Sequence, residues 1–217
     1  MLMLRLLSFG VMGAGGLAAA FTITQLPIPS LGAKAAPDLS ARSLDLAKPR
    51  MFLSEEARQD AAKAELLPPD TRSVLNLPSR MRYGSWVWDD SDIAQGTLTI
   101  YVDLRRQLLS AFRGNHEIGT AVILYGTDTF STPVGRFSVM AKMKTHRSST
   151  YDAAMPYTLR LTSDGVSIHG SDVHGSRATH GCVGVPLDFA RRLFSEAKVG
   201  TKVEIVRSKA PDLSQFS

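Results

Sequence analysis

The only cysteine of this 217-residue chain, Cys182, lies among glycines and histidines. It ends the stretch Thr179-His180-Gly181-Cys182, and His169 precedes it in Ile168-His169-Gly170. One cysteine cannot form a disulfide within its own chain, and a thiol becomes a nucleophile when an imidazole accepts its proton. These residues therefore predict covalent catalysis by Cys182, with His169 as the base.

The surrounding residues suggest how that chemistry is supported. Gly181 lets a substrate carbonyl approach backbone N–H groups, which can stabilise an oxyanion. We expect His169 to end a strand, with Gly170 turning the chain away. Pro186 suits the start of a helix, and we expect that helix dipole to favour the thiolate of Cys182.

Two other hypotheses are open for Cys182 and the histidines near it in the sequence. Three histidines and the cysteine are enough ligands for zinc, but their spacing lacks the usual CxxC or HExxH pattern, so we expect no metal and no cofactor. The four residues are His169, His174, His180 and Cys182. Cys182 could instead be a small buried apolar residue, although the neighbouring glycine and histidine disfavour a core position. His116, His146 and His174, taken singly, are expected at the surface.

The elements that must hold the site have β-strand character. From about Trp86 onward apolar residues alternate with polar ones, as in Leu98, Ile100 and Val102, and turn residues separate such runs. This pattern predicts a mainly β, antiparallel domain with few short helices. One helix is expected after Pro186 and ends near Gly200, and residues 138–157 are expected to cross the surface as a long polar loop.

The N-terminal region has the layout of an export signal. Arg5 precedes an uncharged apolar stretch from Leu6 to Ile23, and small residues at Ala33 and Ala35 suit cleavage. We expect residues 1–35 to be a signal peptide or, if uncleaved, a membrane anchor, which exports the rest to the periplasm or cell envelope. Residues 36–85 are expected to be a linker with a short helix capped by Ser54, residues 86–207 a catalytic domain, and residues 208–217 a C-terminal tail.

The charge of the chain adds little about partners. The formal net charge is +5. No run of Arg and Lys with interleaved aromatics occurs, so we expect no nucleic-acid partner.

Several motifs in order resemble the YkuD-type L,D-transpeptidases, over roughly Thr97 to Val206. The family's HG…THGC motif is matched in this chain between Ile168 and Cys182. The supporting segments, in chain order, are Ser131-Thr132-Pro133-Val134-Gly135-Arg136-Phe137, Ala154-Met155-Pro156-Tyr157 and Gly200-Thr201-Lys202-Val203.

The resemblance implies a β-sandwich or barrel-like fold and acyl transfer on peptidoglycan stem peptides during cell wall biogenesis. Cys182 would form an acyl-enzyme and pass it to an amine of another stem, giving a 3→3 crosslink, or to a lipoprotein lysine. His169 would be the base. The resemblance assigns oxyanion or orienting roles to His180, Gly181 and Gly170, and substrate contacts to Tyr157 and Thr179.

One position departs from the family pattern. The family commonly has Arg or Asn two residues after the cysteine, where this chain has Gly184. An arginine there suits a substrate carboxylate, and Arg160, Arg177 or Arg191 could replace it. Two alternatives therefore stay open: an L,D-peptidase that transfers the acyl group to water, and a catalytically impaired cell-wall-binding module.

Overall fold

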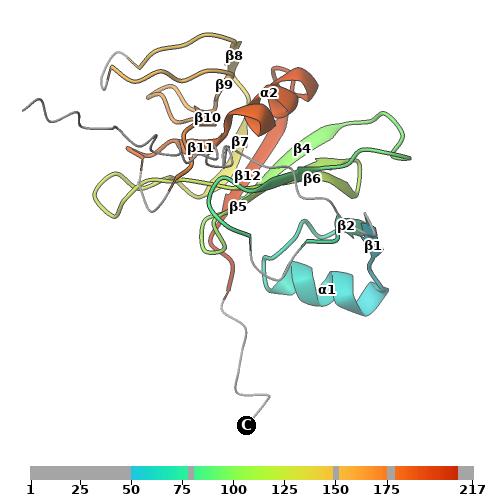
Figure 1. The fold of residues 1–217 in the computed structure, drawn as a ribbon. Helices are drawn as coiled ribbons and strands as arrows, with labels where there is room; N and C mark the ends of the chain where they lie inside the picture. Colours follow the sequence, from blue (N-terminus) through green and yellow to red (C-terminus); the bar gives the residue numbers. More distant parts are fainter. Residues whose placement is uncertain (1–49, 78–80, 149–151, 175–178, 210–217) are drawn as a thin grey trace, which may run out of the picture. The chain divides into compact units, whose positions relative to one another are not determined.

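The computed structural model describes residues 50–77, 81–148, 152–174 and 179–209, and within these ranges the chain is mostly β-sheet with two helices (Figure 1). The elements in chain order are β1 (Arg50–Phe52), α1 (Glu55–Lys63), β2 (Ser73–Leu75), β3 (Trp86–Trp88), β4 (Leu98–Asp103), β5 (Leu108–Arg113), β6 (His116–Val122), β7 (Gly135–Ser138), β8 (Ala141–Met143), β9 (Thr158–Arg160), β10 (Ser167–Ser171), β11 (Val183–Pro186), α2 (Leu187–Glu196) and β12 (Lys202–Val206).

The strands form two sheets. The larger has the order β1-β2-β6-β5-β4-β12-β7, with β3 paired to β6, and the smaller has the order β11-β10-β9-β8. The mainly β prediction is confirmed, but the antiparallel expectation is incomplete, since β4 pairs with β12, and β10 with β11, in parallel. Helix α2 lies in the connection that leads from β11 of the smaller sheet to β12 of the larger one.

Both sheets contribute to one apolar core. Ile100 and Ile205 of the larger sheet, Ile168 and Val185 of the smaller, and Phe189 of α2 belong to the same cluster and are almost fully buried. Alternation of apolar residues along β4 and β12 sends one set of side chains into this core. The smaller sheet, which contains His169, is thereby fixed against the larger one.

The segment before the predicted catalytic domain joins the larger sheet. The expected short helix is present as α1, and the Ser54 hydroxyl caps it by accepting a hydrogen bond from the Ala57 N–H at 3.1 Å. Strands β1 and β2 on either side of α1 were not anticipated, because each has only three residues. The domain boundaries proposed from the sequence stay predictions.

Both ends of the chain lie partly outside the described residues. The predicted signal or anchor, residues 1–35, falls wholly outside them, as do residues 210–217. Of the proposed tail, Ser208 is buried and its N–H donates to Asp103 at 3.3 Å. No helix in the described ranges has the length and apolar character to cross a membrane.

Candidate active site

Strands β10 and β11 place His169 and Cys182 on neighbouring segments of the chain. In their parallel register Ile168 pairs with Val183 and His169 with Gly184, and Cys182 directly precedes β11. Paired residues of parallel strands share a face, and alternate residues return to the same face. The side chains of His169 and Cys182 therefore belong to the same face of the strand pair, one step apart. His169 lies in the middle of β10, so the expectation that it ends its strand was wrong.

The His169 imidazole is held in one tautomer. The ring is buried, and Nδ1 lies 2.9 Å from the carbonyl oxygen of Gly170. A carbonyl only accepts, so Nδ1 carries the proton and Nε2 presents a lone pair. Burial lowers the pKa of His169, against the opposing effect of this hydrogen bond. The imidazole is thus neutral near pH 7 and able to accept a proton.

The Cys182 thiol is half-buried and protonated at rest. Burial raises the pKa of Cys182; a hydrogen bond with the Ser167 backbone opposes this rise, and the Asp164 carboxylate adds to it. The thiol points toward the Gly165 carbonyl oxygen, 3.8 Å from Sγ. Helix α2 begins at Leu187, beyond the far end of β11, so the expected contribution of its dipole to the thiolate was wrong.

A tight turn carries the chain into Cys182. The Thr179 hydroxyl donates to the Cys182 carbonyl, and the Thr179 N–H donates to the Tyr125 carbonyl at 2.9 Å. Gly181 has φ +100°, a backbone conformation that L side chains rarely adopt. Thr179 and Gly181 therefore shape this turn, and their proposed roles toward substrate stay predictions.

His180 lies on the exposed side of the turn. Its ring meets Phe130 edge-on, with 5.0 Å between centroids and 64° between planes. The sequence reasoning did not single out Phe130. The residue comes from the connection between β6 and β7.

The other side of β10 is closed by the segment that precedes β9. The Gly170 N–H donates to the Pro156 carbonyl at 2.8 Å, and a Cβ at Gly170 would meet Leu187 at 3.0 Å and Pro156 at 3.2 Å. The Tyr157 ring packs edge-on against Phe194 of α2, with 5.7 Å between centroids. Tyr157 thus forms part of the wall behind Gly170, and its contact with substrate stays a prediction.

A further histidine, His146, lies near His169. Its proximity adds to the lowering of the His169 pKa, after burial. The Met155 N–H donates to the His146 carbonyl at 2.8 Å, which folds the β8–β9 hairpin back beside β10. From the sequence, His146 was expected at the surface. Its proximity to His169 depends on the pairing of β8 with β9, which has no local signal in the sequence. Residues 141–143 form β8, so the region is not one long loop as expected.

Gly184 occupies a closed position. A Cβ there would lie 2.9 Å from the Ser171 Cβ and 3.6 Å from the Leu124 Cβ, so a side chain meets packed neighbours. Two of the arginines suggested to replace the family's Arg or Asn have other partners in the structure. Arg160 donates to the carbonyls of Thr162 and Ser163, and Arg191 pairs with Asp188 at 3.0 Å. Arg177 lies outside the described residues.

The histidines suggested as zinc ligands with Cys182 do not form a cluster in the structure. His174 is exposed and contacts the Asp172 carboxylate through Nδ1. Across the parts of the chain that the structure describes, no three His, Cys, Asp or Glu side chains group as a metal site would require.

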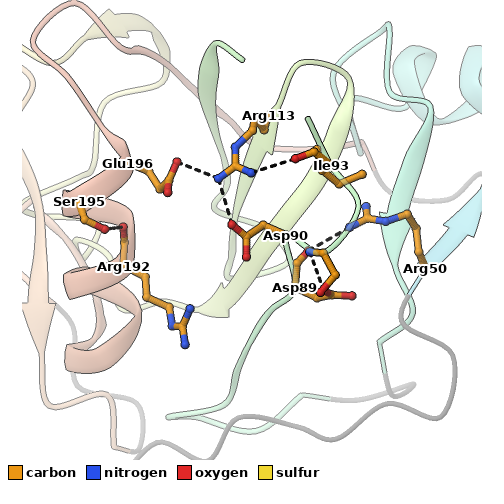
Figure 2. Close-up of polar contacts among 9 residues, drawn as sticks. Arg50, Asp89, Asp90, Ile93, Arg113, Arg192, Ser195 and Glu196 are labelled. Carbon is orange, nitrogen blue, oxygen red and sulfur yellow. Dashed lines mark hydrogen bonds and ion pairs between the residues drawn. The ribbon is translucent and has the colours of Figure 1, made fainter. Parts of the chain in front are cut away.

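The helix that continues from β11 is anchored at its far end. Arg113 of β5 donates to Glu196 of α2 at 2.9 Å and to Asp90 at 3.1 Å, as well as to the Ile93 carbonyl at 3.3 Å (Figure 2). The Arg113 side chain is only 2% exposed. Trp88 and Trp86 pack edge-on against Phe189 of the same helix. These contacts fix α2, and with it strand β11, which begins directly after Cys182.

Comparison with known proteins agrees with the motif pattern. The family model for the YkuD L,D-transpeptidase catalytic domain matches residues 97–205. Among curated protein sequences, none matches the chain.

Solved structures that resemble the fold are L,D-transpeptidases. One from Stackebrandtia nassauensis is 23% identical, with a TM-score of 0.49, over 54% of this chain and 58% of that one. A mutant L,D-transpeptidase from Enterococcus faecium is 26% identical, with a TM-score of 0.47, over 52% and 50% of the two chains. L,D-transpeptidase 1 of Mycobacterium tuberculosis is 23% identical, with a TM-score of 0.46, over 51% and 62%. The chain thus spans 50% to 62% of the length of these proteins.

Proposed function

The chain belongs to the YkuD family of L,D-transpeptidase catalytic domains, and we propose that it is an exported peptidoglycan L,D-transpeptidase with Cys182 as nucleophile and His169 as general base. The observation that carries the proposal is the register of β10 with β11. It sets the neutral imidazole and the lone thiol on one face of adjacent strands.

The first half-reaction forms an acyl-enzyme. Cys182 Sγ attacks the carbonyl of the third stem-peptide residue while its proton passes to Nε2 of His169. A C–S bond forms, the amide C–N bond breaks, and His169 returns the proton to the departing amine of the terminal D-alanine. Because both groups are neutral at rest, the proton moves when the substrate is bound rather than beforehand.

The second half-reaction transfers the acyl group to an amine. The acceptor nitrogen attacks the thioester, its proton passes to His169, and the C–S bond breaks to restore the thiol. An amine of a second stem gives the direct crosslink, and a lipoprotein lysine is the other acceptor we propose. In both steps backbone N–H groups of the turn at Gly181, together with His180, are proposed to stabilise the oxyanion.

Analysis of cell-wall fragments distinguishes the possible activities. Purified sacculi are treated with the protein, digested to muropeptides and weighed by mass spectrometry. A transpeptidase gives new dimers that contain direct crosslinks, and these disappear with Cys182→Ala and His169→Ala but persist with His174→Ala, the matched exposed histidine. Shortened monomers without dimers indicate an L,D-peptidase instead. If the fragments match those from Cys182→Ala, the enzyme proposal fails and the wall-binding module is favoured.

Export is a separate proposal, supported by the sequence of residues 1–35. The mass of the mature protein isolated from the envelope tests it. A chain that begins near Ala36 supports a cleaved signal, full length supports an anchor, and recovery of the full-length chain solely from the cytoplasm contradicts export.

A further inference from the structure

An exposed aromatic side chain lies next to the turn that carries the nucleophile. Phe130 is 48% exposed, although a phenyl ring gains from leaving water. Its edge-on contact with His180 places it beside a residue two positions from Cys182. Scattered exposed apolar residues are ordinary, so its location and the rigidity of its support decide whether it has a role.

The backbone under Phe130 is held firmly against this turn. The Phe130 N–H donates to the Thr127 hydroxyl at 3.2 Å, and the Gly126 N–H donates to the Thr132 hydroxyl at 2.9 Å. A Cβ at Gly126 would lie 1.9 Å from the Phe130 carbonyl oxygen and 2.9 Å from the Gly181 Cα. Three segments of main chain therefore meet where only glycine fits, and the backbone of Phe130 is held against the turn that leads to Cys182, with its ring against His180.

We propose that Phe130 and His180 form an aromatic shelf that packs against the aliphatic side chain of the residue whose carbonyl Cys182 attacks. This inference rests on the proposed function. When that carbonyl reaches Sγ, the side chain on the same residue is only one bond beyond the Cα, and it is the nearest apolar substrate group outside the reacting amide. A stem-peptide diamino acid offers a chain of methylenes there, which gains free energy by covering an aromatic face.

The chain contains a matched comparison for this shelf. Phe52 of β1 is 73% exposed and also meets a histidine edge-on, His116, with 6.4 Å between centroids. Strand β1 is at the opposite end of the larger sheet from β7, which follows the Phe130 segment. Phe52→Ala thus removes an exposed phenyl ring of the same kind away from the nucleophile.

Binding is measured by calorimetry in a Cys182→Ala background, so that no turnover occurs. The titrants are donor peptides that differ only in the number of side-chain methylenes at the third residue. Peptide affinity is expected to rise about two- to fourfold for each methylene. Phe130→Ala removes this dependence, Phe130→Trp retains it, and Phe52→Ala leaves it unchanged. Equal dependence in Phe130→Ala and its parent overturns the shelf, as does peptide binding with no dependence on chain length.

Turnover measurements with Cys182 intact separate this inference from the proposed function. Phe130→Ala should raise the KM for the donor severalfold with little change in kcat, and should leave alkylation of Cys182 by iodoacetamide unchanged. A lower alkylation rate would mean that Phe130 acts by holding the turn, and would overturn the shelf. If the protein binds peptides with the expected dependence but forms no product, the transpeptidase proposal fails while the shelf stands.

Discussion

Cys182 and His169 are both kept uncharged by their surroundings. Burial is the largest cause for each, and it raises the pKa of the thiol while lowering that of the imidazole. A preformed thiolate–imidazolium pair would need the opposite shifts. At rest the thiol and the imidazole are therefore both neutral, and a protonated thiol reacts slowly with small electrophiles.

Alkylation of the free protein tests the charge state of Cys182. Its rate with iodoacetamide should rise with an inflection above the ordinary thiol value of about 8.5, because the thiolate is the reactive form. His169→Gln should change this profile little, since the imidazole is not charged at rest. Rapid alkylation that persists down to about pH 5 in the parent and is lost in His169→Gln would instead demonstrate a resting ion pair.

Gly184 lies at a position with little room for a side chain. The lost substrate contact expected from the absence of Arg or Asn stays a prediction, and the structure adds that Ser171 closes the position. We expect Gly184→Ala to reduce the free energy of unfolding by about 1–3 kcal/mol because of overpacking. Ser171→Gly removes the Cβ that a residue at 184 would meet.

A double-mutant comparison in urea checks this explanation. Gly184→Ala combined with Ser171→Gly should recover much of the lost stability, so the two changes should not be additive. Additive losses would show that the contact with Ser171 is not the cause.

Among the secondary-structure elements, α2 depends on a buried guanidinium. Arg113 joins β5 to Asp90 after β3 and to Glu196 of α2 (Figure 2). Its side chain is buried, while the two carboxylates are 40% and 31% exposed, so solvent partly screens the pairs. We expect Arg113→Met to reduce the free energy of unfolding by about 1–3 kcal/mol.

Arg136→Met provides the matched control for this change. Arg136 also pairs with a glutamate, Glu204 at 3.3 Å, but its side chain is 85% exposed. An exposed pair contributes only about 0–1 kcal/mol. Equal losses of stability in urea melts of the two variants would contradict a special role for the buried Arg113.

Elements with clear local signals could be predicted, and those defined by tertiary pairing could not. Ser54 and the acidic residues after it indicated α1, and Leu98, Ile100 and Val102 indicated β4. The three-residue strands β1, β2 and β8 carry too few residues for a period. The site follows the same rule. Cys182 and His169 were recognisable from their motif, whereas His146 and Phe130 approach it only through the hairpin and the loop contacts of the folded chain.

For the molecule as a whole, a buried carboxyl couples folding to pH. Glu117 of β6 is buried, and its Oε2 accepts a hydrogen bond from the Leu75 N–H of β2 at 2.8 Å. Burial raises the pKa of Glu117, against hydrogen bonds from Ser110 and Leu75 and the charges of nearby arginines. The folded state thus binds this proton more tightly than the unfolded chain, so its stabilising contribution is present at low pH and lost as pH rises through the folded pKa.

Glu117→Gln should remove this dependence. The amide keeps an oxygen to accept from Leu75 and has no charge to bury, so the variant should be at least as stable as the parent at pH 7. The difference between the two in urea melts should grow in favour of the variant from about pH 4 to pH 7, while Glu56→Gln, an exposed change on α1, should show no such trend. A variant that becomes relatively less stable as pH rises would contradict a protonated Glu117.

Trapping the covalent intermediate tests the central claim most directly. The protein is mixed with a donor stem peptide without an acceptor, quenched in acid within the first turnover, and weighed intact. We predict a mass increase equal to the peptide minus its terminal D-alanine, located on Cys182 by peptide mapping, absent from Cys182→Ala and strongly reduced in His169→Ala. Turnover of the peptide with no adduct at Cys182, or an equal adduct in His169→Ala, would contradict the account.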